Sequence, residues 1–142
     1  MNILLTSHGS VCAGFLNAFS MFGTVEHIHT VDLTDTGIDD FRGRLTAVIT
    51  ELLDQGKLLI LADLVGGTPY NESYALAIQN PEAIRLVGGM NFPMLLEAGV
   101  LAMSCDDLDE VASAAVSAGL NGISLAKIPE DSVDAESEDE LF

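Results

Sequence analysis

The sequence predicts a single doubly wound α/β domain with a mainly parallel sheet and helices on both faces. Three observations lead to this prediction. Short apolar runs of strand length alternate with longer segments whose apolar residues recur at helical spacing. The connections between these segments are short, as is typical of parallel strands joined by crossover helices. A length of 142 residues fits one such domain and is enough to bury a core.

The first half of the chain contains three predicted strands and two predicted helices. Strands are expected at residues 2–6, 27–31 and 57–62. The third of these is a continuous apolar run, as expected of a strand that is covered on both faces. Helices are expected at about residues 9–22 and 38–53, and Gly56 ends the second. Thr36 resembles the N-cap of that second helix.

The second half of the chain continues the alternation. Thr68 is expected to cap a third helix, with Pro69 at its first position. The remaining elements are expected at residues 84–87 (strand), from about residue 94 (helix), at residues 108–119 (helix) and at residues 123–125 (strand). If the strands follow the flavodoxin-like order, the first and third strands are neighbours in the sheet.

Composition and charge exclude several classes of partner. The chain carries 22 acidic and five basic residues, which gives a net charge of −17 at pH 7. This balance excludes nucleic acid and anionic lipid as partners and favours a protein with a basic face. Seven of the acids lie in residues 129–142, which are expected to form a solvated, disordered tail outside a domain at residues 1–128.

Hydropathy and cysteine content predict the cellular setting. No apolar run approaches the ~18 residues needed to span a bilayer, and the first residues lack the basic segment of a signal peptide. A cytoplasmic, soluble protein without membrane insertion is therefore expected. The hydrophobic content of 49% indicates a buried oligomer interface as well as a core. Cys12 and Cys105 form no CxxC pair, so neither a disulfide framework nor a metal site is predicted, and no cofactor is expected.

Two stretches far apart in the chain are predicted to form one site. Leu4–Gly9 and Leu61–Asn71 are each an apolar run that ends on a polar residue and continues through glycine into a helix. Because the first and third strands are neighbours, His8 and Asp63 are expected to face each other at the sheet edge where ligands bind. Asp63 then accepts a hydrogen bond from Nδ1 of His8, which leaves the lone pair of Nε2 outward as a nucleophile.

The residues around this pair favour an anionic group. Backbone N–H groups after Ser7, at Gly9, and around Gly66, Gly67 and Thr68 are candidates to bind phosphoryl oxygens, together with the hydroxyls of Ser7 and Thr68. No lysine or arginine lies near either stretch in the sequence. The pattern indicates a phosphohistidine site, although spacing alone defines an anion-binding His–Asp edge and not the reaction.

These residues resemble those of a known family. The stretches Thr6–Gly9, Asp63–Asn71 and Gly89–Leu95 look like the three signature stretches of the enzyme IIA component of the mannose/fructose/sorbose-type sugar phosphotransferase system. The resemblance covers about residues 1–128 in the same order and spacing.

The resemblance implies a homodimeric phosphotransferase that needs no cofactor. A phosphoryl group passes from phosphohistidine of the carrier HPr onto His8. It then moves to a histidine of a IIB component, expected as a separate chain, and through a membrane IIC/IID complex to an incoming sugar. Asp63 matches the aspartate that orients the histidine, and Thr68 matches a residue near the phosphoryl oxygens.

The resemblance also implies a rim where partners dock and an exchanged strand in the dimer. Asn91 and Pro93 match a loop that flanks the site, and Asn71 lies on the same rim. Val65 occupies a position that is often aromatic in the family, which puts the shape of this chain's partner surface in question. Ile123–Leu125 is the candidate for a C-terminal strand exchanged between subunits.

Two other functions stay open at the level of the sequence. A phosphoryl-relay subunit of a dihydroxyacetone kinase system has a similar domain and histidine but serves a soluble kinase. A regulatory binding module would accept a phosphoryl group and pass it no further. The sequence does not identify the sugar.

Overall fold

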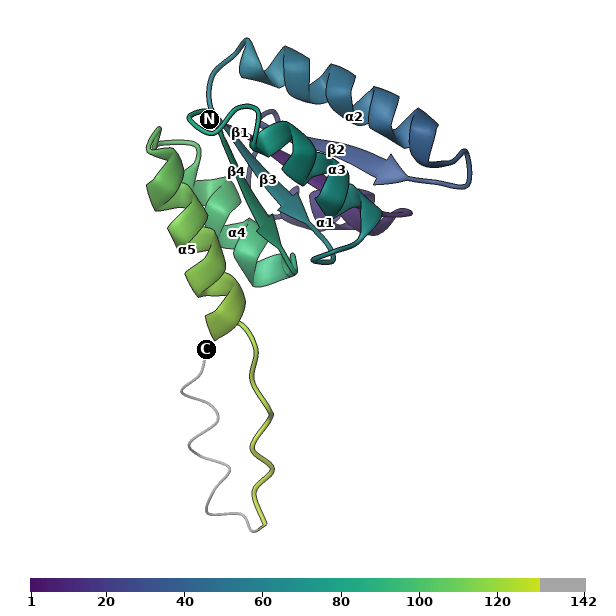
Figure 1. The fold of residues 1–142 in the computed structure, drawn as a ribbon. Helices are drawn as coiled ribbons and strands as arrows, with labels where there is room; N and C mark the ends of the chain where they lie inside the picture. The colour runs from purple at the N-terminus through teal and green to yellow at the C-terminus, as the bar shows by residue number, and fades with distance from the viewer. Residues whose placement is uncertain (131–142) are drawn as a thin grey trace.

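The computed structural model describes residues 1–130, so the tail predicted at residues 129–142 lies outside the described part from residue 131 on. Four strands form one sheet in the order β2-β1-β3-β4, and every neighbouring pair is parallel (Figure 1). The strands are β1 (Asn2–His8), β2 (Ile28–Leu33), β3 (Leu58–Ala62) and β4 (Ile84–Gly88). The helices are α1 (Val11–Phe19), α2 (Ile38–Leu53), α3 (Thr68–Ala77), α4 (Phe92–Leu101) and α5 (Leu108–Asn121). The predicted α/β fold is confirmed, with β1 and β3 side by side.

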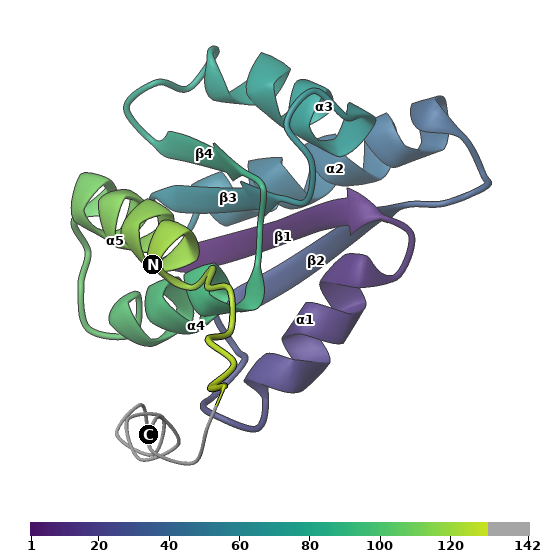
Figure 2. The same cartoon turned by 90° about the horizontal axis from the view of Figure 1, so that it is seen from below.

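The helices cover both faces of the sheet. Figure 2 shows α2 and α3 on one face, with α1 and α4 on the other. Because side chains of a strand alternate between faces, Ile3 and Leu5 pack toward α1, α4 and α5, whereas Leu4 packs toward α2. All five residues of β3 are buried, which confirms the strand covered on both sides. Helices on both faces leave the carboxyl edge of the sheet as the place where polar side chains can gather.

Several helix ends differ from the sequence prediction. Helix α1 is shorter than the expected residues 9–22, and α4 begins at Phe92 rather than at about residue 94. The N-cap of α2 is Gly37 and not Thr36, because the Thr36 hydroxyl donates to a carboxylate oxygen of Asp40 at 2.7 Å. The turn gives Gly37 a φ of 101°, a backbone conformation that favours glycine. Helix α3 begins one residue earlier than expected, with Gly67 as its N-cap. Helix α5 continues through Gly119 to Asn121.

The predicted strand at residues 123–125 does not form in the single chain. Ile123 and Leu125 are 73% and 96% exposed, and the segment after α5 extends away from the sheet (Figure 1). The prediction is wrong for the isolated chain, in which residues 123–125 pair with no strand, although Ile123 lines a cavity with Val87 and Gly88 of the edge strand β4. Exchange of the segment between subunits stays a prediction.

None of the helices within residues 1–130 is long and apolar enough to cross a bilayer.

An ion pair between Arg42 and Glu72 joins α2 to α3, and it should make stability depend on pH. Arg42 donates from Nε and a terminal nitrogen to the two carboxylate oxygens of Glu72, each at 2.9 Å. These hydrogen bonds lower the pKa of Glu72 below its ordinary value. A lowered pKa stabilises the fold above the unfolded-state value, and this stabilisation is lost as pH falls through the folded-state value.

We expect Glu72→Gln to lower the melting temperature at neutral pH by a few degrees, on the order of 2–4 °C. The difference from wild type should vanish at a pH low enough to protonate the carboxyl in both the folded and the unfolded state. Thermal unfolding followed by circular dichroism at both pH values measures this. Glu82→Gln is the matched control, since Glu82 is exposed and pairs with no cation in residues 1–130. An equal loss in the control, or a loss that persists in acid, contradicts the assignment.

Candidate active site

His8 and Asp63 meet at the carboxyl edge of the sheet. His8 is the last residue of β1, and Asp63 follows directly after β3. The Oδ2 atom of Asp63 accepts the backbone N–H of His8 at 2.9 Å and lies 2.9 Å from Nδ1 of the imidazole. Because an ionised carboxylate can only accept hydrogen bonds, Nδ1 carries the proton and Nε2 keeps its lone pair. The pairing expected from the sequence is present in the structure.

The two side chains differ in exposure. The imidazole of His8 is 47% exposed, whereas the carboxylate of Asp63 is 15% exposed. The other carboxylate oxygen, Oδ1, is buried and has no hydrogen-bond partner within residues 1–130, so both hydrogen bonds that the carboxylate makes there go to His8. The hydrogen bond to Asp63 fixes the ring on its Nδ1 side. The opposite nitrogen, Nε2, is not used by this contact.

A glycine-containing turn lies against the open side of the imidazole. A Cβ atom on Gly67 would lie 2.7 Å from Cε1 and 3.4 Å from Nε2 of His8. Gly66 has a φ of +84°, and its carbonyl accepts a hydrogen bond from the side-chain amide of Asn71 at 3.0 Å. Only a residue without a side chain at position 67 allows the turn to approach the ring this closely.

The start of α3 lies next to Nε2. Gly67 is the N-cap, Thr68 is the first helical residue and Pro69 is the second. The first turn of a helix presents unpaired N–H groups and the positive end of the helix dipole. The Thr68 hydroxyl makes no hydrogen bond with any other part of the described chain. The N–H of Gly67 donates to the carbonyl of Leu64 at 3.1 Å, so the N–H and hydroxyl of Thr68 are the nearest candidate donors for an anionic group on Nε2.

Ser7 and Gly9 lie in the turn between β1 and α1, where their polar groups are already engaged. The buried Ser7 hydroxyl donates to the Gly9 carbonyl at 3.0 Å and accepts from the backbone N–H of Cys12 at 2.8 Å. The N–H of Gly9 donates to the carbonyl of Leu33 on the neighbouring strand at 2.7 Å. In this structure both residues shape the turn that carries His8.

The residues expected on the rim fall into two groups. Val65 is 62% exposed beside the glycine turn, and Asn71 braces that turn. Asn91 instead caps α4 by accepting from the N–H of Met94 at 3.1 Å, and its amide donates to the carbonyl of Gly119 in α5. Pro93 packs beside Gly122 at the end of the same helix. Asn91 and Pro93 thus join α4 to α5, and neither forms a hydrogen bond to His8.

Sequence reasoning missed two residues that support the site, Gly88 and Tyr70. A Cβ atom on Gly88, at the end of β4, would lie 2.4 Å from a methyl carbon of Val65 and 3.0 Å from the ring of Tyr70. The only signal in the sequence is the Gly88-Gly89 pair directly after the fourth predicted strand. Such pairs have several uses, so the signal does not single out Gly88.

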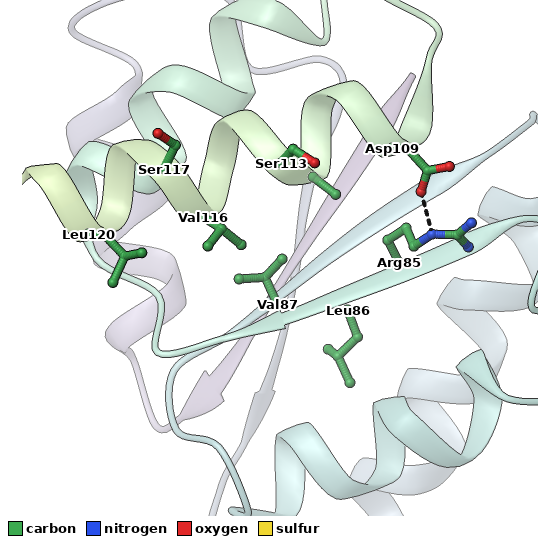
Figure 3. Close-up of a pocket in the computed structure, with 9 residues that line it drawn as sticks. Arg85, Leu86, Val87, Asp109, Ser113, Val116, Ser117 and Leu120 are labelled. Atoms are coloured by element: carbon green, nitrogen blue, oxygen red, sulfur yellow. Dashed lines mark hydrogen bonds and ion pairs between the residues drawn. The ribbon is translucent and has the colours of Figure 1, made fainter.

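A cavity lies away from His8, along the open edge of β4. It has a volume of about 580 Å³ and is lined by residues of β4 and α5. Figure 3 shows Val116 and Leu120 of α5 facing Val87 of β4, with the ion pair of Arg85 and Asp109 at one end. The lining is mainly apolar, and its polar side chains are Ser113, Ser117 and the ion-paired Arg85 and Asp109. Within residues 1–130, no group of three or more His, Cys, Asp or Glu side chains is placed to hold a metal ion.

Comparison with known proteins agrees with this geometry. The family model described as "PTS system fructose IIA component" matches residues 2–116. The sorbose-specific EIIA component of Lacticaseibacillus casei is 37% identical over 105 residues, which cover 70% of this chain and 72% of the relative. The mannose-specific EIIAB component of Escherichia coli K12 is 26% identical over 132 residues, and the match spans 88% of this chain but only 39% of that longer relative.

A solved structure shares both the fold and the family name. The mannose/sorbose specific IIA subunit from Enterococcus faecalis superposes with a TM-score of 0.78 at 28% identity, covering 92% of this chain and 98% of that one. The family model matches well over half of the chain, and the matched residues include the whole sheet that carries His8. The chain therefore belongs to the mannose-type family of IIA components, which take part in the phosphoryl relay of the sugar phosphotransferase system.

Proposed function

We propose that the chain is a phosphoryl carrier in which His8 accepts a phosphoryl group from phospho-HPr and donates it to a IIB component. The observation that carries the proposal is the contact between Nδ1 of His8 and Oδ2 of Asp63 at 2.9 Å, on a side chain that is 47% exposed. In the neutral imidazole this contact assigns the proton to Nδ1, so the lone pair of Nε2 is available for attack. The carrier domain is proposed to span residues 1–128 and to work in the cytoplasm.

The chemistry needs only imidazole nitrogens and a preorganised site. The lone pair of Nε2 attacks phosphorus on the donor, and the donor's P–N bond breaks with its electrons returning to the donor imidazole. Positive charge that develops on the His8 ring is stabilised by the Asp63 carboxylate. Donation to IIB is the reverse step. Since donor and acceptor are both protein histidines, the proposal includes no metal or cofactor.

The phosphoryl oxygens are proposed to be bound by the first turn of α3. The candidate donors are the N–H and the hydroxyl of Thr68, the residue after Gly67, whose Cβ position would lie 3.4 Å from Nε2. The site includes no cationic side chain. The arginines nearest along the chain, Arg42 and Arg44, are paired with carboxylates on α2, α3 and β2. Binding through dipoles rather than full charges suits a carrier, which must release its phosphoryl group.

Intact-mass spectrometry at neutral pH tests the proposal. The chain is incubated with enzyme I, HPr and phosphoenolpyruvate, and is expected to gain one acid-labile phosphoryl group. A purified IIB component should then discharge it, and the membrane IIC/IID complex would act after IIB. Discharge by a dihydroxyacetone kinase instead would assign the relay-subunit alternative, and retention with both acceptors would assign a regulatory module. No gain in mass beside an active HPr control contradicts the carrier function.

Gly67→Ala is expected to slow phosphorylation by about a hundredfold, because the new Cβ overlaps Cε1 of His8 and displaces the ring from its productive position. Single-turnover transfer from phospho-HPr, followed by rapid quench, measures the rate. Gly23→Ala is the matched control, since its Cβ would meet only Phe19 at an ordinary 3.6 Å. A wild-type rate in Gly67→Ala would remove this turn from the site.

The proposal includes a homodimer in which residues 123–128 of each chain lie along β4 of the other. In the single chain β4 is an edge strand, and an unpaired edge can bind an added strand. The cavity between β4 and α5 (Figure 3) and a second one of about 280 Å³ between α3 and β4 flank this edge. Ile123, Leu125 and Ile128 are 73%, 96% and 79% exposed, so alternate side chains of the segment can fill both cavities.

Leu125→Asp is expected to convert the dimer to monomer, because it places a charge in an apolar groove. Size-exclusion chromatography with light scattering gives the mass. Met21→Asp is the control, as Met21 is also a highly exposed apolar residue, at 82%, but lies after α1. A monomeric wild type, or a dimer that survives Leu125→Asp, contradicts this arrangement.

A further inference from the structure

The last residue of β4 leaves room for two side chains that belong to the active-site turn and helix. Gly88 pairs in register with Ala62, the residue before Asp63. A Cβ atom on Gly88 would lie 2.4 Å from Cγ2 of Val65 and 3.0 Å from Cδ2 and Cε2 of Tyr70. The φ of Gly88 is not positive, so the backbone conformation admits other residues. Glycine is needed here for space alone.

The two side chains that rest on Gly88 flank the turn against His8. Val65 immediately precedes Gly66 and Gly67, and Tyr70 lies in the first turn of α3. The backbone of this turn is tied to the helix, because the carbonyl of Gly67 accepts the N–H of Asn71 at 2.9 Å. A displacement of Val65 and Tyr70 therefore moves the turn and the helix start together.

The residues after β4 also form a hydrogen bond with the end of β3, which Asp63 follows directly. The N–H of Met90 donates to the carbonyl of Ala62 at 2.9 Å, one residue before Asp63. Gly67 in turn lies against His8, because a Cβ atom built on Gly67 would be 2.7 Å from Cε1 of the imidazole. Contacts thus run without a gap from Gly88, through Val65 and the glycine turn, to the imidazole.

From these contacts we infer that Gly88 is a positioning residue for phosphoryl transfer, which sets the place of the imidazole and the α3 donors through Val65 and Tyr70. The inference rests on the proposed function for its kinetic readout. A side chain at position 88 pushes the turn toward or away from the ring, so it alters the transfer step more than the docking of the donor protein.

A glycine elsewhere in the molecule provides a matched control. A Cβ atom on Gly99 in α4 would lie 2.4 Å from Cε2 of Phe19, the same overlap as at Gly88. Phe19 belongs to the core between the sheet and α1, and makes no contact with the glycine turn through these atoms. Gly99→Ala therefore introduces the same steric cost without the connection to His8.

The experiment compares Gly88→Ala, Val65→Ala, the double variant and Gly99→Ala in the full chain. One readout is the single-turnover rate and apparent KM with phospho-HPr. The other is the ¹⁵N NMR spectrum of the His8 imidazole, which reports its hydrogen bond to Asp63. Gly88→Ala is expected to lower the rate constant by on the order of tenfold or more, with KM little changed and the imidazole resonances shifted. Gly99→Ala is expected to lower the melting temperature while keeping the wild-type rate and spectrum.

The double variant tests the route of the effect. Removing the Val65 methyl groups removes the closest overlap, so Gly88→Ala should have little further effect on rate or spectrum in the Val65→Ala background. An equal effect in both backgrounds, a wild-type rate in Gly88→Ala, or a slower rate with an unchanged imidazole spectrum overturns the inference.

Two further outcomes are also decisive. If Gly88→Ala does not fold, Val65→Ala replaces it, because this variant removes side-chain atoms from the same contact. A wild-type rate and imidazole spectrum in Val65→Ala would then overturn the inference. If wild type accepts no phosphoryl group, the proposed function fails, while the NMR comparison of the four variants still decides whether Gly88 positions His8.

Discussion

His8→Ala is expected to abolish phosphorylation of the chain while leaving the fold intact. The variant removes the only imidazole at the carboxyl edge of the sheet, and with it the nucleophile. Since the side chain is 47% exposed and ends a strand, its loss leaves no cavity in the core. Intact mass after incubation with enzyme I, HPr and phosphoenolpyruvate measures the first effect, and circular dichroism measures the second.

His29→Gln is the control for loss of a histidine. His29 lies within β2, where Nε2 is 3.2 Å from the side-chain oxygen of Asn2, away from the edge that carries His8. This variant should gain the phosphoryl group as wild type does. A phosphoryl group on His8→Ala would assign the acceptor to another residue and refute the proposed carrier site.

Asp63→Asn is expected to slow transfer by a factor between about 10² and 10⁴ without changing the final extent of phosphorylation. The Oδ2 atom accepts both the backbone and the ring N–H of His8, and a neutral amide no longer stabilises positive charge on the ring. An amide can also present its NH₂ group to Nδ1, which would place the proton on Nε2 and block attack.

Rapid-quench single-turnover kinetics separates rate from extent for this variant. Asp54→Asn serves as the control, because Asp54 is exposed at the opposite end of the molecule after α2 and contributes the same charge. An unchanged rate in Asp63→Asn would remove this carboxylate from the mechanism.

The parts of the fold that were predictable are those set by local pattern. Apolar runs of strand length and helical spacing identified four strands and five helices. The parallel order then placed the end of β1 beside the end of β3, and so His8 beside Asp63. Helix starts were less predictable because a hydroxyl near a helix start has several possible hydrogen-bond partners besides the backbone N–H groups of the first turn. The Thr36 hydroxyl bonds Asp40 rather than capping α2.

The parts that were not predictable depend on contacts between distant residues. The Ser7 hydroxyl is engaged by Gly9 and Cys12, which a motif cannot show. Gly88 supports the site only because β4 pairs with β3, which puts it under a side chain 23 positions earlier in the chain. The apolar residues at 123–125 were read as a strand, but in the single chain they pair with no other strand and Ile123 and Leu125 are exposed.

The exposure of the imidazole has a consequence for how long a phosphoryl group stays on the protein. A group attached to a nitrogen that is open to solvent meets water as readily as it meets an acceptor histidine. Because the His8 side chain is 47% exposed in this structure, enclosure by residues 1–130 does not provide selectivity. Discrimination between hydrolysis and transfer then depends on time: the acceptor must dock and align faster than water reacts. Such a carrier would hold the phosphoryl group for a short time. The fraction transferred rather than hydrolysed would then depend on how fast the acceptor protein docks as well as on the site itself.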